Sequence, residues 1–249
     1  MPISRSDSAL FSERIMAVLG WLAAQQKTSA GSGVGPAEVR VNALVHTGPS
    51  KVDDMVSDPL FWLQNYTQTR DSHWREAGAK SPYRPFPKKA YFRPIVERFQ
   101  KEQVLFIEKS RDMMISWLCV GLFTHVAMTT EGIEVLFQSQ KEEKAFELVE
   151  YAKILYERQH PEIQKAYPLK RKHQAAGILE FAHGSRIIGI PGGGDQIRSY
   201  HPWGLFQDEA AFMPEAGESY DHAVPVCQKI VVVSSAGPGW FADFVNNCD

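Results

Sequence analysis

The stretch FIEKSRDMMISWL, residues 106–118, decides how the fold of this chain is interpreted. It begins in a short apolar run, passes through polar residues and enters a second apolar segment, so it predicts a strand, a turn and a helix. A strand that leads into a phosphate-binding loop and then a helix has the same layout. Yet the stretch has neither the glycines nor the late lysine of such a loop. Two interpretations follow: a nucleotide site with its parts moved, or an ordinary strand–turn–helix.

The standard phosphate loop is G-x-x-x-x-G-K-[ST], whose backbone amides and helix N-terminus hold the phosphates. When its final hydroxyl is aligned with Ser116, Ile115 takes the lysine position and Met114 takes the position of the second glycine. Ser116 keeps a hydroxyl that ligates Mg²⁺. Lys109 opens the octet, and its long flexible side chain can reach the same phosphates from there. Taken alone, the octet also fits a turn with a chance lysine and serine. The candidate ATP-binding loop consists of Lys109, Ser110, Arg111, Asp112, Met113, Met114, Ile115 and Ser116.

The sequence after residue 103 alternates between strand and helix patterns. Short apolar runs predict strands at 104–109, 133–139, 203–208 and 229–235, and longer apolar or amphipathic stretches predict helices at 116–128 and 141–159. GILEFA and RIIGIP flank the turn residues HGS, which indicates a hairpin. Strands that alternate with helices are typical of an α/β fold with a mostly parallel central sheet flanked by helices.

The N-terminal part differs in composition. Apolar residues at helical spacing predict a small helical segment at 1–26, and KTSAGSGVGPA begins a flexible linker that we place at 27–56. Residues 57–100 are rich in aromatic residues and are cut by prolines into short helices and turns. We assign 57–249 to a single domain.

A pair of acids follows the predicted strand at 203–208. Asp208 and Glu209 would lie at the carboxyl end of that strand, the edge of an open α/β sheet where ligands bind. Asp208 is the candidate Mg²⁺ ligand together with Ser116, and Glu209 is the candidate that polarises the attacking water. The alternative is a helix N-terminus that carries two acids to complement its dipole. Gln207 interrupts the apolar run that the first interpretation expects.

A third motif, VVVSSAGPGWF at 231–241, is a buried strand that ends in small hydroxyl residues. In sheet ATPases this position senses the terminal phosphate, so Ser234, Ser235 and Ala236 are a candidate coupling motif. A strand followed by a Gly-Pro turn is the simpler interpretation. The order favours the functional one, since the acid pair lies about 90 residues after the loop and the third motif about 25 residues further on.

With these motifs, the chain resembles the ATPase half of the large terminase of tailed bacteriophages, which has a P-loop NTPase fold of the RecA-like (ASCE) type. The resemblance rests on KSRDMMISW, GSRIIGIPGGGDQIRSYHPWGLFQDEAAF and VVVSSAGPG, within residues 84–241. In that family the loop, called Walker A, often begins with lysine, which matches Lys109, and the acid pair corresponds to Walker B. Met114 departs from the glycine expected there.

The resemblance implies roles for further residues. Arg198 matches an arginine finger offered to a neighbouring subunit, with Arg111 as an alternative phosphate-sensing cation. Phe86 is expected to stack on the adenine and Gln100 to read its edge, although aromatic residues in this region are more often core.

The resemblance also implies a function. We expect an ATPase that uses ATP and Mg²⁺ to drive double-stranded DNA into a procapsid in the cytoplasm of the host bacterium. Its partners would be the portal protein, the small terminase subunit and further copies of the chain in a ring, most simply a pentamer. The C-terminal nuclease domain of the family is absent from 57–249, so no DNA cleavage is expected. The alternatives are a helicase-like translocase and a non-hydrolysing module that docks on the portal or small subunit.

Composition sets wider limits. With a net charge of −2 and a pI near 6.5, the chain is not uniformly coated with DNA-binding charge. The basic run LKRKH at 169–173 is more simply a solvated face than a DNA contact. No apolar run is long enough to span a bilayer, so no membrane association is expected. The three cysteines and eight histidines have no metal-ligand spacing.

Overall fold

The computed structural model describes residues 51–246 except 72, 77 and 171–174. The predicted helical segment at 1–26 and most of the predicted linker lie outside the described residues. The last six residues of that linker were predicted wrongly, because Lys51–Val56 forms helix α2 and buries Met55 and Val56 in the core. The apolar side chains of this short segment give it a packed position that a linker composition does not suggest.

A six-stranded sheet in the order β3-β8-β7-β4-β6-β5 forms the centre of the domain. All of its neighbouring strands pair in parallel except β5, which forms an antiparallel hairpin with β6. This confirms the predicted α/β class, with strand ends that differ from the predicted ones by one or two residues. The strands are β3 Val104–Glu108, β4 Glu134–Ser139, β5 Ile178–Glu180, β6 Arg186–Pro191, β7 Gly204–Asp208 and β8 Lys229–Ser234.

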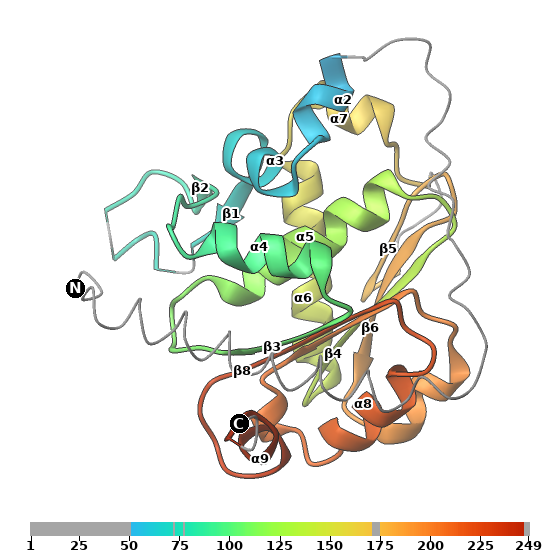
Figure 1. The fold of residues 1–249 in the computed structure, drawn as a ribbon. Coiled ribbons are helices and arrows are strands. Elements are labelled where there is room, and N and C mark those ends of the chain that lie inside the picture. Colours follow the sequence, from blue (N-terminus) through green and yellow to red (C-terminus); the bar gives the residue numbers. More distant parts are fainter. Residues whose placement is uncertain (1–50, 72, 77, 171–174, 247–249) are drawn as a thin grey trace.

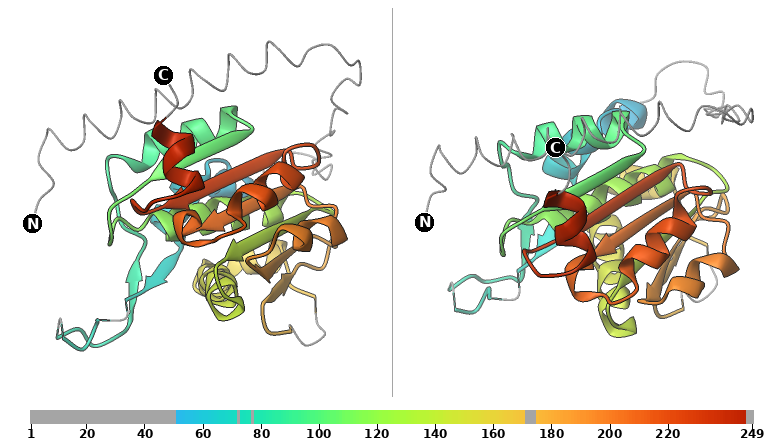
Figure 2. Two further views of the ribbon diagram at one scale, coloured as in Figure 1. Left: turned by 90° about the horizontal axis from the view of Figure 1, so that it is seen from below. Right: turned by 60° about the horizontal axis from the view of Figure 1, so that its bottom comes forward.

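Helices cover both faces of the sheet (Figure 1). On one face lie α4 Phe92–Lys101, α5 Ile115–Thr129 and α6 Glu142–Glu157, with α2, α3 Pro59–Tyr66 and α7 Pro161–Ala166 packed outside them. The other face carries the 3-10 helices η1 Gly194–Ser199 and η2 Ala210–Phe212, and the helices α8 Ala216–Ala223 and α9 Trp240–Asn246. A small antiparallel hairpin of β1 Gln68–Arg70 and β2 Tyr83–Pro85 projects from the body, cyan in Figure 2.

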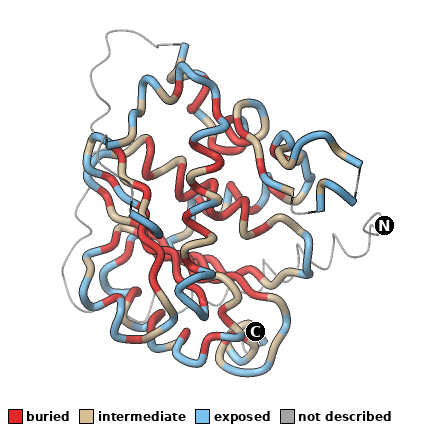
Figure 3. Tube along the Cα trace, turned by 180° about the vertical axis from the view of Figure 1, so that it is seen from behind, coloured by how far each residue is buried: buried red, intermediate tan, exposed pale blue. Residues whose placement is uncertain are grey.

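Each strand contributes to two separate cores because its side chains alternate between the faces. Val135 and Phe137 of β4 pack in the core beneath α4–α6, whereas Leu136 packs in the core beneath α8 and α9. Figure 3 shows the sheet as the most continuously buried part of the fold. Burial on both faces explains why these strands read as near-continuous apolar runs in the sequence.

Among the helices of the described residues, α5 buries the largest share of its side chains, as its apolar sequence predicts. Gly121 lets it approach α3, because a Cβ atom there would lie 2.5 Å from Leu63 Cδ2. The close packing fixes the axis of α5 and therefore the position of its N-terminus, where Ser116 lies. No helix within the described part of the chain is both long and apolar enough to cross a membrane.

Candidate active site

The three motifs predicted from the sequence meet at one edge of the sheet. β3, β8 and β7 are neighbours and run in parallel, so their carboxyl ends lie side by side. The candidate phosphate loop follows β3, the acid pair ends β7, and the serine pair ends β8. Segments about 90 and 120 residues apart in the sequence thus form one site.

The backbone of the loop is held from both sides. The Lys109 amide donates to the Ser234 carbonyl at 2.9 Å, which joins the loop to β8. The Tyr91 hydroxyl donates to the Met113 carbonyl at 2.9 Å, which joins the loop to the residue preceding α4. Asp112 and Met114 both have positive φ, at 62° and 58°. Glycine adopts this conformation freely, whereas a methionine is strained in it. Met114 therefore adopts a backbone conformation that favours glycine.

Lys109 and Glu209 form the central ion pair, with 2.7 Å between Lys109 Nζ and Glu209 Oε1. The lysine side chain is only 9% exposed, whereas that of Glu209 is 37% exposed. The Ser235 hydroxyl donates to Glu209 Oε2 at 2.9 Å. Burial raises the pKa of Glu209, but the hydrogen bonds from Lys109 and Ser235 outweigh it, so the pKa lies below its ordinary value. Glu209 is therefore ionised near neutral pH, as a group that orients water must be.

Ser116 and Asp208 form a second contact, in which the serine hydroxyl donates to Asp208 Oδ1 at 3.0 Å. Burial raises the pKa of Asp208 to about 6, although the nearby Lys109 ammonium and the Ser116 hydrogen bond act in the opposite direction. A hydroxyl and a carboxylate side by side are hard oxygen donors that suit Mg²⁺, which keeps several waters and takes few protein ligands. No cluster of three or more acidic, histidine or cysteine ligands occurs among the described residues. The donor set thus fits a magnesium ion that shares its coordination with phosphate.

The end of β8 contacts both other motifs. Ser234 accepts from the loop at its carbonyl, and its hydroxyl accepts a hydrogen bond from the Ala211 amide at 3.0 Å. Ser235 holds Glu209, and Ala236 is exposed beyond it. Two of the three residues of the candidate coupling motif therefore touch the segments that carry the predicted phosphate and water ligands.

Arg198 lies apart from this cluster, in η1. Its guanidinium contacts Asp195 Oδ1 at 2.9 Å and His222 Nε2 at 2.6 Å, and its side chain is 61% exposed. Over the residues that the structure describes, no hydrogen bond or ion pair joins it to the loop or to Glu209. The predicted role of Arg198 as an arginine finger toward a neighbouring copy stays a prediction. Arg111, the alternative cation, is exposed on the loop itself.

The predicted adenine role of Phe86 does not fit the structure, and that of Gln100 stays a prediction. Phe86 is 1% exposed and packs against Phe92 with 5.8 Å between ring centroids, so neither face of its ring is open to a base. Gln100 is exposed near the end of α4, nine residues beyond Tyr91. At 1.5 Å per residue the helix carries it roughly 13 Å away from the end that touches the loop. Aromatic and amide residues were assigned from their place in the sequence, which gave no information on burial or on the direction of α4.

Sequence reasoning missed two residues around the site, Tyr91 and Gln138. Tyr91 fixes the loop, and no motif marks it. Gln138, at the carboxyl end of β4, accepts a hydrogen bond from Gln207 Nε2 at 2.9 Å. The two glutamines are opposite each other in the strand register, which explains why a polar residue interrupts the apolar run of β7. The sequence did contain a signal for this contact, since the predicted strands at 133–139 and 203–208 each carry a glutamine near their carboxyl end.

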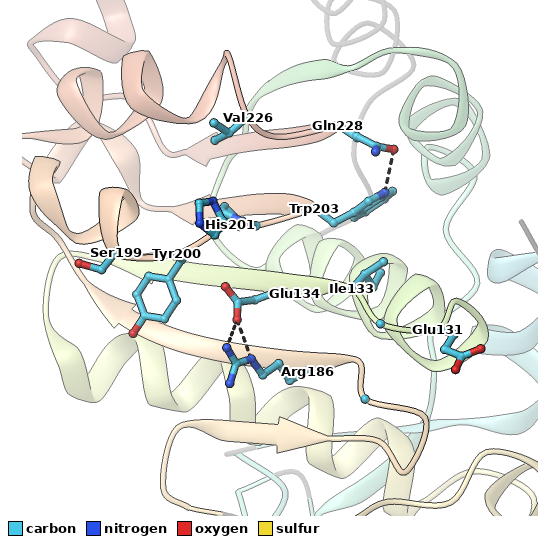
Figure 4. A pocket seen from close by; sticks show the side chains of 13 residues that line it. Glu131, Ile133, Glu134, Arg186, Ser199, Tyr200, His201, Trp203, Val226 and Gln228 are labelled. Carbon is cyan, nitrogen blue, oxygen red and sulfur yellow. Dashed lines mark hydrogen bonds and ion pairs between the residues drawn. The ribbon is translucent and has the colours of Figure 1, made fainter. Parts of the chain in front are cut away.

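A cavity of about 700 Å³ lies elsewhere, at the amino ends of β4, β6 and β7 (Figure 4). An ion pair between Glu134 and Arg186 crosses it, and the Trp203 indole donates to Gln228 at 3.0 Å at one side. None of the predicted site residues lines it. Ligands of open α/β sheets bind at the carboxyl ends of the strands. We therefore place the candidate site at the loop and the acid pair, and not at this cavity.

Comparison with known proteins gives structural likeness only. No protein-family model matches the chain, and no curated protein matches it. The HK97 bacteriophage large terminase superposes with a TM-score of 0.56 at 9% identity, over 77% of this chain and 40% of that one. A Thermus phage P74-26 large terminase ATPase domain superposes with a TM-score of 0.42 at 14% identity, over 71% of this chain and 73% of that one.

The chain thus spans about two fifths of the length of the HK97 protein. Identity this low establishes a shared fold and nothing finer. The fold is the one that the motifs predicted, a RecA-like arrangement shared with a bacteriophage large terminase.

Proposed function

We propose that this chain is the ATPase motor domain of a viral terminase large subunit, which hydrolyses ATP to drive double-stranded DNA into a procapsid. The observation that carries the proposal is the convergence of Lys109, Ser116, Asp208, Glu209 and Ser235 at the carboxyl ends of three adjacent parallel strands. Chance would rarely bring a lysine, a hydroxyl and two acids to the one edge of the sheet where ligands bind.

Each residue has a distinct role in the proposed reaction. Lys109 pairs with the terminal phosphates of ATP, and the loop amides with the N-terminus of α5 supply further donors. Ser116 and Asp208 would hold Mg²⁺, which would supply positive charge to the phosphates when bound. Glu209 orients the attacking water. Arg198 acts on the nucleotide of a neighbouring copy, since it contacts Asp195 and His222 in its own chain and neither Asp208 nor Glu209.

The Lys109–Glu209 ion pair joins the proposed phosphate ligand to the proposed water ligand, with 2.7 Å between the ammonium and Oε1. Phosphate oxygens compete for the same ammonium, so nucleotide binding releases Glu209. Ser235 keeps its contact with the other carboxylate oxygen and so holds Glu209 in place after the lysine has left.

The further elements of the proposal rest on the resemblance to large terminases. A motor of this kind requires ATP and Mg²⁺ as cofactors, a homo-oligomeric ring, most simply a pentamer, and the portal protein and small terminase subunit as partners on the procapsid. Its place would be the cytoplasm of the host bacterium. Translocation of DNA, in preference to strand separation, is proposed from the fold shared with the HK97 large terminase.

The experiment that tests the proposal is ATP turnover against protein concentration, with and without Mg²⁺ and double-stranded DNA. We expect Mg²⁺-dependent hydrolysis that rises more than linearly with concentration, because neighbouring copies supply Arg198. Glu209→Ala should abolish it and Arg198→Ala should remove only the concentration dependence.

A second candidate, a non-hydrolysing docking module, is favoured by Met114, a strained side chain where the backbone should approach phosphate. Nucleotide binding without turnover at any concentration would support that module and exclude the motor.

A further inference from the structure

Two glutamines form a buried polar contact beside the acid pair. Gln207 immediately precedes Asp208 in β7, and its Nε2 donates to Gln138 Oε1 at 2.9 Å and to the Ala216 carbonyl at 3.2 Å. Both side chains are fully buried. They lie on the face of the sheet that packs against α8, because Leu205 and Leu136, two residues earlier in each strand, belong to that core. Apolar side chains would fill this position without the free-energy cost of burying polar groups, which suggests that the polar pair has a function.

Gln138 connects this pair to the segment after β6. Its Nε2 lies 3.2 Å from the Pro191 carbonyl, 3.3 Å from the Gly193 carbonyl and 3.1 Å from Ser219 Oγ. The Ser219 hydroxyl in turn donates to the Gly193 carbonyl at 3.1 Å. Gln138 therefore fixes the start of the loop that leads into η1.

The same loop positions Arg198. The Gly194 amide donates to Glu215 Oε2 at 2.8 Å, and the Gly194 carbonyl lies 2.9 Å from His222 Nδ1. The other ring nitrogen of His222 contacts the Arg198 guanidinium. A path thus runs from Gln207 through Gln138 to Gly193, along the chain to Gly194, and through His222 to Arg198.

The path has one unsatisfied member. Gln207 Oε1 is buried and has no hydrogen-bond partner in the structure. A buried amide oxygen without a donor is costly. Gln138 faces Gln207 with its amide oxygen and gives its amide donor to the Pro191 and Gly193 carbonyls and to Ser219. To bring that donor to Gln207 Oε1, both amides would have to turn, which would also withdraw it from the loop.

We propose that Gln207 and Gln138 form a relay that transmits the state of the acid pair at the end of β7 to the loop that carries Arg198. Both glutamines are positioning residues for that arginine, and neither touches nucleotide. Because Gln207 adjoins Asp208 in the chain, a shift of the acid pair on Mg²⁺–ATP binding moves its amide directly. The inference rests on the proposed function, in which Arg198 has phosphate charge to act on.

The test is hydrogen–deuterium exchange of the full chain over residues 192–199, with and without Mg²⁺ and a non-hydrolysable ATP analogue. Gln207→Leu removes the relay. Leu205→Val is the matched control, since it lies on the same face of the same strand and alters packing without touching the pair. The double variant Gln138→Leu/Gln207→Leu replaces both partners by apolar groups of similar size, which restores stability more readily than a single change does. Affinity for the analogue is measured for each variant.

We expect the analogue to change the exchange of the wild-type loop by about three- to tenfold, the effect of gaining or losing one hydrogen bond. Gln207→Leu and the double variant should bind the analogue within about twofold of wild type yet lose the response, and Leu205→Val should keep it. Turnover by Gln207→Leu should also lose its dependence on protein concentration, as Arg198→Ala does. The double variant carries the same test if the single variant does not fold.

The relay is wrong if the loop of Gln207→Leu, or of a double variant with restored stability, still responds to the analogue. It is also wrong if the wild-type chain binds the analogue with no change in the loop. Absence of binding to the wild-type chain would be a failure of the proposed function itself, which the affinity measurement distinguishes, and the relay would be rejected with it.

Discussion

Replacement of Met114 by glycine tests the conformation of the candidate phosphate loop. Met114 has φ 58° and ψ 20°, a left-handed conformation that costs a residue with a Cβ about 1–2 kcal/mol. Glycine removes this strain, but it raises the entropy of the unfolded chain by the equivalent of about 0.4–1 kcal/mol. Met114 is also half-buried against the core, and loss of its side chain costs about 1 kcal/mol, roughly half the value for full burial. Met114→Gly should therefore leave the free energy of unfolding within about 1 kcal/mol of wild type.

The sharper comparison is with alanine at the same position. Met114→Ala loses the packing and keeps the strain, so it should be less stable than Met114→Gly by about 0.5–1 kcal/mol. The neighbouring Met113 is equally half-buried and is not among the residues with positive φ, so the order should reverse there, with glycine the less stable.

Thermal or urea unfolding of the four variants measures both differences, each about 1–4 °C in Tm. The reasoning is refuted if glycine is no more stable than alanine at position 114. Met114→Gly should in addition bind ATP more tightly than wild type, because the backbone can then approach the phosphates.

Three further predictions concern the body of the domain. Burial lowers the pKa of Lys229 to about 8, against the opposing effect of Glu102, so between pH 8 and the unfolded value of 10.5 the unfolded state binds more protons. The free energy of unfolding of wild type, relative to that of Lys229→Met, should then rise across that window by at most about 1.4 kcal/mol per pH unit. A difference in urea unfolding that stays constant with pH would contradict the lowered pKa of Lys229. Phe86→Ala should cost about 3–5 kcal/mol of stability, because the ring is core; a loss confined to ATP affinity would instead restore its adenine role. Gly121→Ala should cost about 1 kcal/mol net, because overpacking against the buried Leu63 exceeds what alanine gains over glycine in a helix, and thermal unfolding above that of wild type would show that Leu63 yields freely.

The central strands could be predicted because the physics that forms them is local. β3, β4, β7 and β8 are buried on both faces, so each appears in the sequence as an apolar run bounded by polar residues. Parallel pairing then brings their carboxyl ends to one edge, and this was enough to place Lys109, Asp208 and Glu209 near one another. The adjacent strand order also made the end of β8 part of the same site.

The contacts of the site depended on information that the linear sequence does not hold. The Lys109–Glu209 ion pair depends on side-chain directions across two strands. The contact between Gln138 and Gln207 depends on the register of β4 and β7, which a shift of one residue would abolish. The adenine role of Phe86 was predicted wrongly because its burial follows from tertiary packing. The assignment of α2 to a linker failed for the same reason.

The affinity of the chain for Mg²⁺–ATP, with and without Lys109→Met, tests the central claim most directly, namely that a lysine at the start of the loop holds the phosphates. We expect wild type to bind and Lys109→Met to lose about 10- to 100-fold in affinity, the effect of one charged hydrogen bond. Lys88→Met, which removes an exposed lysine from the segment before α4, should bind as wild type does. Equal affinity of wild type and Lys109→Met, or no binding by either, would contradict the account.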